Sequence, residues 1–323
     1  MIGYVARRLG HALFLLIGVS VVCFLFADLA PGDFYTELHF EQGLSAETVA
    51  GMRAHAGLDR TLAARYASWA ASAVRGDWGF SLAYNTPVSA LVAERIRATL
   101  LLTATATVLA WLLAVPWGVW SASRRGRWSD AVSRVLLAAL LVIPDLLIAL
   151  ALLALAARGG SFPIGGMHSR DYEMLSAGER LRDLAWHMAL PVAVLVLGMA
   201  PVLVRHVRAA IADVMESAFA LDARALGIPR GRLLRRHLLP AAMNPLISLA
   251  GLSLGTLLSG SLLVEVVMGW PGLGPLFLDA IMARDFAIVL AVVMCSTLFL
   301  VLGNLAADLL LYRFDPRIRA PGK

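Results

Sequence analysis

The chain has 323 residues, of which 59% are hydrophobic and only 15% are charged. A soluble domain carries about 25% charged residues, so this composition excludes an ordinary soluble protein and indicates a polytopic membrane protein. The basic residues are 27 arginines and one lysine, Lys323, at the end of the chain. Because a P-loop needs a lysine inside its glycine-rich motif, the sequence excludes an ATPase site of this kind.

Six segments are apolar over the length that a membrane span requires. A bilayer core of about 30 Å needs about 20 apolar residues in a helix. The predicted spans, in chain order, are Leu9–Ala30, Ala98–Ala122, Val135–Ala157, Leu184–Val204, Ala241–Val264 and Phe286–Ala307. The first also has the basic flank of a signal peptide, but its apolar run is long for one and no good cleavage site follows, so we predict a retained span.

The distribution of basic residues predicts the orientation of these spans. With the N-terminus in the cytosol, 17 of the 28 basic residues fall in cytosolic segments and 11 in the longer external segments. Basic residues near span ends stay in the cytoplasm, so both termini are predicted to be cytosolic. The expected organisation is an N-terminal span with an external region (1–97), a core transmembrane domain (98–310) and a cytosolic tail (311–323). Within the external region, residues 45–58 and 62–76 have helix-like composition.

The cytosolic loop at 205–240, within the core domain, has the pattern of an ordered elbow. Residues 217–226 are mostly helix formers, and Gly227 then suits the left-handed residue that ends a helix. Pro229 suits the first turn of a second helix, and Pro240 marks the entry to the fifth span. A basic amphipathic helix lying on lipid would have a similar charge pattern, so charge alone leaves both interpretations open.

The spacing within this loop resembles a known motif. Gly227, nine further residues and then His237-Leu-Leu-Pro240 are similar to the EAA loop of ABC-importer permeases. Two positions depart from the general pattern: the EAA triplet reads Leu221-Asp222-Ala223, and His237 replaces isoleucine. Both departures resemble the dipeptide and oligopeptide branch of that family.

The same family resemblance extends along nearly the whole chain. Five further segments are similar to elements of the dipeptide, oligopeptide and nickel importer permeases, in the same order: Tyr4–Leu9 (YVARRL), Ala30–Asp33 (APGD), Arg75–Leu82 (RGDWGFSL), Val264–Val289 and Asp308–Arg319. The sequence is therefore identified as resembling a binding-protein-dependent inner-membrane permease.

The resemblance implies an all-α, type I ABC-importer permease fold with six transmembrane helices in the bacterial cytoplasmic membrane. Such a permease forms half of a heterodimeric pore with a paralogous permease, two ABC ATPase subunits and an extracytoplasmic solute-binding protein. ATP and Mg²⁺ would bind to the ATPase subunits, and no cofactor, metal or nucleic acid is expected on this chain. Dipeptides, oligopeptides, glutathione, nickel and metal chelates are the substrates of this branch. The residues that would couple the loop to the ATPase are Asp222, Ala223, Arg224, Ala225, Gly227, Arg235, His237 and Pro240.

Asp145 is an acid in the middle of the third predicted span, directly after Pro144. A charge near the bilayer centre costs about 3 kcal/mol or more, so it faces a partner or a cavity, and a proline kink suits a cavity wall. Asp145 and Pro144 are therefore candidate pore residues, with Asp145 meeting a cationic group of the substrate such as a peptide amino terminus. The alternative is that Asp145 is a protonated or paired packing residue. Glu265, at the end of the fifth span, is expected to be an interfacial acid.

Two other functions compete with this interpretation. An ion-coupled secondary transporter could use Asp145, but it would predict inverted repeats, which the sequence lacks. A membrane-embedded enzyme would need a clustered nucleophile or metal set, and His168, His187, His206 and His237 are predicted on opposite sides of the membrane. Small residues in the fifth span, including Gly251, Gly255 and Ser259, predict a helix interface with the second permease, with packing inside the chain as the alternative.

Overall fold

The computed structural model describes most of the chain, namely residues 2–30, 32, 34, 35, 45–55, 57–160 and 162–314. Contacts between residues divide the protein into two compact units. The first unit joins Met1–Thr99 to Pro271–Phe299, and the second joins Leu100–Trp270 to Leu300–Lys323. The described residues are predominantly helical, in agreement with the predicted all-α class.

The first unit is built around the N-terminal helix. Its elements are α1 (Ile2–Leu29), α3 (Ala46–His55), α4 (Leu62–Val74), the strands β1 (Phe80–Ser81) and β2 (Thr86–Pro87), the start of α5 (Val88–Ser123), α13 (Leu273–Met282) and the first part of α14 (Phe286–Phe314). The helices α3 and α4 confirm the two helical pieces predicted in the external region. Phe24 of α1 lies against Tyr66, Trp69 and Phe286, with ring centroids 5.3, 5.3 and 5.1 Å away. Aromatic packing therefore holds α4 and the start of α14 to α1.

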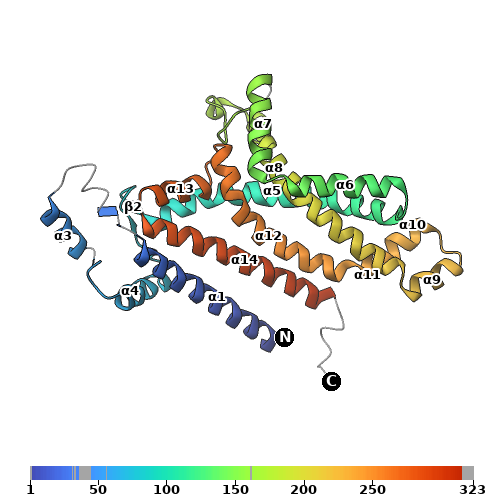
Figure 1. Cartoon of the computed structure of the whole chain (residues 1–323), viewed down its shortest axis with the longest axis horizontal. Helices are drawn as coiled ribbons and strands as arrows, with labels where there is room; N and C mark the ends of the chain where they lie inside the picture. The colour runs from blue at the N-terminus through green and yellow to red at the C-terminus, as the bar shows by residue number, and fades with distance from the viewer. Residues whose placement is uncertain are drawn as a thin grey trace. The chain divides into compact units, whose positions relative to one another are not determined.

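The second unit is organised around the long helix α8. Besides the ends of α5 and α14, its elements are α6 (Trp128–Val142), α7 (Asp145–Gly159), the 3₁₀ turn η1 (Tyr172–Met174), α8 (Ala177–Met215), α9 (Ala218–Ala225), α10 (Arg230–Leu233), the π-helical turn η2 (Leu234–Leu238), α11 (Leu239–Ala241) and α12 (Met243–Val267). Helix α8 packs against α6, α7, α9, η2 and α12. Figure 1 shows α9, α10 and α11 gathered beyond the C-terminal end of α8.

The spans predicted from the sequence are confirmed in part. Among the described residues, four helical segments are long and apolar enough to cross a membrane, and a bent pair of helices makes a fifth. The four segments are Ala6–Leu29, Val88–Ser123, Ala177–Met215 and Phe286–Tyr312. The fifth predicted span overlaps α12. Because α8 continues to Met215, the segment predicted as a loop from Arg205 begins with the end of this helix.

The third predicted span, Val135–Ala157, is not the single helix that the sequence predicts. Helix α6 ends at Val142, and α7 begins at Asp145 after a bend of 93°. Pro144 has no N–H to donate to the preceding turn, and it disfavours helical backbone at the residue before it. Ile143 accordingly has an extended conformation, with φ −81° and ψ 119°. The proline kink predicted here is therefore sharper than a bend within one helix, and Figure 1 shows α7 lying across the direction of α6.

The fifth-span glycines correct a second prediction. A Cβ on Gly251 would lie 2.2 Å from the Cβ of Ala307, and one on Gly255 would lie 2.6 Å from the Cα of Leu300. Both glycines therefore allow α12 to pack closely against α14 of the same chain, instead of facing a second permease. The side chain of Ser259 is outside the described part of the structure.

Candidate functional site

The turn at Gly227 ends α9 with a defined backbone motif. Ser217 precedes the helix, and Gly227 has φ +74°. The N–H of Ile228 donates to the carbonyl of Ala223 (3.2 Å), and the N–H of Gly227 donates to that of Arg224 (3.0 Å). These two bonds are the Schellman pattern, in which a left-handed residue satisfies the last carbonyls of a helix. The predicted role of Gly227 as the end of the first elbow helix is therefore confirmed.

The elbow, defined here as residues 217–241, is fixed to α8 by a small apolar core. Ala220 of α9, Leu233 of α10 and Leu238 of η2 are buried together, at 0%, 2% and 3% exposure. Met215, the last residue of α8, packs against this cluster and also against the larger core around Val207. The elbow is thus an ordered extension of α8 that packs against the last residue of that helix.

The second half of the elbow contains a helical turn that is wider than an α-helical turn, and this turn precedes α12. Residues Leu234–Leu238 form a π-helical turn, in which the N–H of Leu239 donates to the carbonyl of Leu234. Pro240 explains why the α-helical hydrogen-bond pattern is interrupted here. It has no N–H to donate to the carbonyl of Arg236, and its ring crowds that carbonyl. π-Helical turns are uncommon and occur frequently at functional sites. This wider turn leaves Leu238 buried and His237 exposed.

The outer surface of the elbow carries most of the residues predicted from the sequence. Seven are exposed, namely Asp222, Arg224, Ala225, Gly227, Arg235, His237 and Pro240, whereas Ala223 is half-buried against the elbow core. Three apolar residues of the same elbow are not among the residues predicted to couple it to the ATPase. Phe219, Leu221 and Leu226 are 45%, 53% and 81% exposed. Their position off the buried face of a short amphipathic helix is the signal that could have identified them.

Asp145 is the first residue of α7 and is exposed. A Cβ on Gly198 of α8 would lie 2.3 Å from the Oδ1 atom of Asp145, so its carboxylate fills the space that this glycine leaves. The carboxylate also lies at a helix N-terminus, where the unpaired N–H groups and the helix dipole favour negative charge. The bend therefore offers a stabilising environment for the acid while leaving it accessible from outside the chain.

Glu265 differs from the interfacial acid that the sequence predicts. It lies inside α12 with 0% exposure, and the hydroxyl of Ser261 donates to its Oε1 atom at 3.1 Å. One helical turn separates the two residues, so this bond is a local contact within α12. Glu265 is thus a buried polar residue of the second unit.

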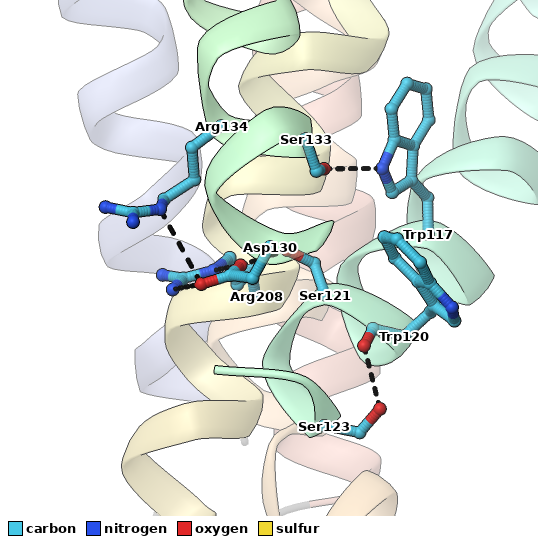
Figure 2. A network of polar contacts seen from close by, with 8 residues as sticks. All are labelled: Trp117, Trp120, Ser121, Ser123, Asp130, Ser133, Arg134 and Arg208. Atoms are coloured by element: carbon cyan, nitrogen blue, oxygen red, sulfur yellow. Dashed lines mark hydrogen bonds and ion pairs between the residues drawn. The ribbon is translucent and has the colours of Figure 1, made fainter. Parts of the chain in front are cut away.

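A buried ion-pair network joins α5, α6 and α8 (Figure 2). Asp130, in the first turn of α6, is 1% exposed and accepts two bonds from Arg208 of α8, one from Nε and one from Nη2, each 2.8 Å long. Ser121 of α5 donates its hydroxyl to Asp130 at 2.6 Å. Arg134 approaches the same carboxylate at 3.6 Å but is 59% exposed. A bidentate arginine–carboxylate pair of this kind fixes orientation as well as position.

Neighbouring contacts reinforce the network around Asp130. Trp117 of α5 donates its indole N–H to the hydroxyl of Ser133 in α6 at 2.7 Å, as Figure 2 shows. A Cβ on Gly118 would lie 2.6 Å from Cγ1 of Val207, so α5 and α8 approach closely at this level. In the sequence, Arg134 and Arg208 are two of the 17 basic residues predicted to be cytosolic, and Asp130 is not among the predicted site residues. The pairing depends on two segments that are 78 residues apart, so no local pattern predicts it.

The first unit holds a second polar cluster, between two segments on which the family resemblance depends. Ser81 donates its hydroxyl to Oδ2 of Asp285 at 2.7 Å, and the N–H of Ala83 donates to the same atom at 3.1 Å. Tyr84 donates its hydroxyl to Asp279 at 3.1 Å. Burial and this hydrogen bond raise the pKa of Tyr84 above its usual value, so the hydroxyl keeps its proton. The strand pair β1–β2 is thereby fixed to the turn between α13 and α14.

Comparisons with known proteins agree with this architecture. Residues 114–320 match the family described as "Binding-protein-dependent transport system inner membrane component". The oligopeptide transport system permease protein AppB of Bacillus subtilis (strain 168) is 33% identical over 320 residues, covering 98% of this chain and 99% of that protein. The glutathione transport system permease protein GsiC of Escherichia coli (strain K12) is 32% identical over 329 residues, covering 99% of each.

The fold is also found among solved structures. A chain of the inward-facing MetNI methionine ABC transporter superposes with a TM-score of 0.53 at 19% identity, covering 70% of this chain and 96% of that one. Identity at this level shows a shared fold only. With a family match over most of the chain and relatives of more than 30% identity over almost its full length, the protein belongs to the family of binding-protein-dependent transport system inner membrane components, the multi-pass permease subunits of ABC importers.

Proposed function

We propose that this permease is one half of a heterodimeric pore that takes up peptides or a related small solute. The relatives named for oligopeptide and glutathione transport cover 98% and 99% of the chain, which supports this substrate class. The other half would be a paralogous permease, with two ABC ATPase subunits and a solute-binding protein completing the importer. The proposed topology has six spans with both termini in the cytosol, the external region at 1–97, the core domain at 98–310 and the tail at 311–323.

The elbow is proposed to be the docking site for an ATPase subunit. The observation that carries this proposal is the set of exposed apolar side chains on an ordered elbow: Phe219, Leu221 and Leu226 are exposed, whereas the elbow core packs against Met215. Exposed apolar groups of this kind mark protein contacts. The exposed arginines Arg224 and Arg235 would add charge complementarity at the rim of the contact.

Asp145 is proposed to face the translocation pathway. Its carboxylate is exposed at the α6–α7 bend, and the proline break of Pro144 suits a helix that lines a cavity. A peptide carries a positively charged amino terminus, which such a carboxylate would attract. Asp145 would then contribute to substrate selection by charge, and the ATPase subunits would supply the driving force.

The experiment that tests the proposed function is uptake by the complete complex in proteoliposomes. The complex contains this permease, its paralogue, the ATPase subunits and the solute-binding protein, and radiolabelled di- to pentapeptides are supplied outside. We expect uptake that requires internal ATP and the binding protein and that persists when ionophores collapse all ion gradients. Uptake that needs an ion gradient and not ATP would contradict the proposal and support a secondary transporter using Asp145.

A further inference from the structure

Helix α8 contacts three parts of the second unit, namely the elbow, the start of α6 and the start of α7. Its last residue, Met215, packs into the elbow core. Arg208, about two turns earlier, holds Asp130 at the start of α6. Gly198, about 15 Å further along α8, lies against the carboxylate of Asp145 at the start of α7. Helix α6 is thus joined to α8 at Arg208, and α7 contacts α8 at Gly198.

These contacts close a triangle of α6, α7 and α8. Helix α6 runs from the Asp130 pair to the 93° bend, and α7 starts at the bend with Asp145 against α8. A displacement of α8 has to carry the bend with it as long as α6 stays fixed to α8. In the described structure, the buried Asp130–Arg208 pair makes the directed polar contacts between these two helices that Figure 2 shows.

We propose that the Asp130–Arg208 pair is the joint that transmits movement of the elbow to the α6–α7 bend, with Ser121 as its third member. Asp130 and Arg208 are positioning residues in this scheme, because they touch neither the substrate nor ATP. This proposal rests on the proposed function, since it assigns the elbow to the ATPase and the bend to the pathway.

The chemistry of the pair suits a joint. The carboxylate is 1% exposed, and both of its oxygens accept bonds from Arg208. Two parallel charge-assisted hydrogen bonds restrict rotation of the two side chains relative to each other, whereas a single hydrogen bond would allow it. Without Arg208, the buried carboxylate of Asp130 would keep only the hydroxyl of Ser121 and the more distant, exposed Arg134, which destabilises the contact. Loss of the pair should therefore loosen α6 from α8 without directly altering either the elbow or the bend.

The test compares uptake per ATP hydrolysed in the reconstituted complex. Asp130→Asn keeps the size of the side chain and removes its charge, and we expect uptake per ATP to fall about fivefold to tenfold. Arg134→Gln is the matched control, because Arg134 lies at the exposed edge of the same carboxylate. We expect this control to stay within about twofold of the unsubstituted complex. The double variant Asp130→Arg with Arg208→Asp restores an ion pair and should recover at least half of the lost coupling.

Each outcome is decisive. Asp130→Asn with coupling equal to the Arg134→Gln control would overturn the proposal, as would a double variant no better than Asp130→Asn alone. If Asp130→Asn fails to insert, Arg208→Lys replaces it, because lysine keeps the charge and loses the bidentate geometry. Unchanged coupling in Arg208→Lys would then overturn the proposal. Absence of ATP-driven uptake in the unsubstituted complex would instead contradict the proposed function, so the two failures are distinguishable.

Discussion

Asp145 shows how much a single residue can depend on a break in a helix. In an unbroken third span the acid would lie within a hydrocarbon-facing helix, at a cost of about 3 kcal/mol or more. The bend instead places it at the N-terminus of α7, against the open backbone of Gly198. The acid is therefore exposed at a helix terminus, where backbone N–H groups have no partner within the helix.

The first prediction concerns the charge of Asp145. If its carboxylate meets the amino terminus of a peptide, Asp145→Asn should reduce uptake of a free peptide about tenfold, because a charge-assisted contact contributes about 1.5–3 kcal/mol. The same peptide with an acetylated amino terminus serves as the internal control, and its uptake should be equal in both complexes. The measurement is initial uptake by proteoliposomes with each peptide. A parallel loss for both peptides would show that Asp145 has a structural role and is not a substrate contact.

At the residue scale the sequence identifies backbone requirements better than partners. Gly227 was predicted to end a helix, and its φ of +74° agrees, because a left-handed position leaves a local signature of glycine after a helical run. Asp130 leaves no such signature. Its partner Arg208 lies 78 residues away in the sequence, so no local pattern connects the two.

At the scale of elements, α12 and α14 show that small residues do not reveal which helix they pack against. The glycine spacing of α12 correctly indicates a close helix contact, but the partner is α14 of the same chain. The sequence cannot distinguish these cases, because packing in lipid favours the same small residues in both. The α6–α7 bend is likewise only partly predictable from the sequence. Pro144 predicts a break in the helix, whereas the 93° angle depends on where α7 packs.

The second prediction tests this helix contact. Gly255→Ala would place a methyl group 2.6 Å from the Cα atom of Leu300, so α12 and α14 must separate. Overpacking of this kind costs about 1–3 kcal/mol. We expect a lower midpoint of thermal unfolding for the purified protein in detergent. Gly260→Ala is the control, because Gly260 lies on the same helix with nothing within 4 Å of its added Cβ. Equal midpoints for the two variants would refute the assigned contact.

Two motifs that are far apart in the sequence define the first unit. The segment RGDWGFSL and the segment that contains α13 each resemble the family separately, and no local pattern connects them. The structure joins them through Ser81 and Asp285. Neither the strand pair nor α13 was predicted, since a two-residue strand is too short for a periodic pattern and α13 is an apolar helix of 10 residues.

For the whole molecule, the apolar spans and the basic loops allowed the class and most helices to be predicted, because the bilayer imposes length and charge rules that are local in sequence. The family resemblance then indicated an importer permease, and the relatives confirm it. The contacts that hold α5, α6 and α8 together could not be predicted, since they depend on how separate helices meet. We propose that the elbow, whose turn depends on Gly227, conveys ATP-driven movement to these helices.

The measurement that tests this claim most directly is ATPase activity stimulated by the loaded binding protein, recorded together with uptake, in Gly227→Val complexes. A β-branched residue at φ +74° is strained by about 1–2 kcal/mol, which is enough to misplace the elbow and too little to unfold the helices. Gly231→Val is the control, because Gly231 lies on the same elbow with helical backbone and open space around it. We expect normal insertion for both variants, with stimulated ATPase activity and uptake lost only in Gly227→Val. Gly227→Val complexes with normal stimulation and normal uptake would show that the turn at Gly227 is not needed to transmit movement from the ATPase.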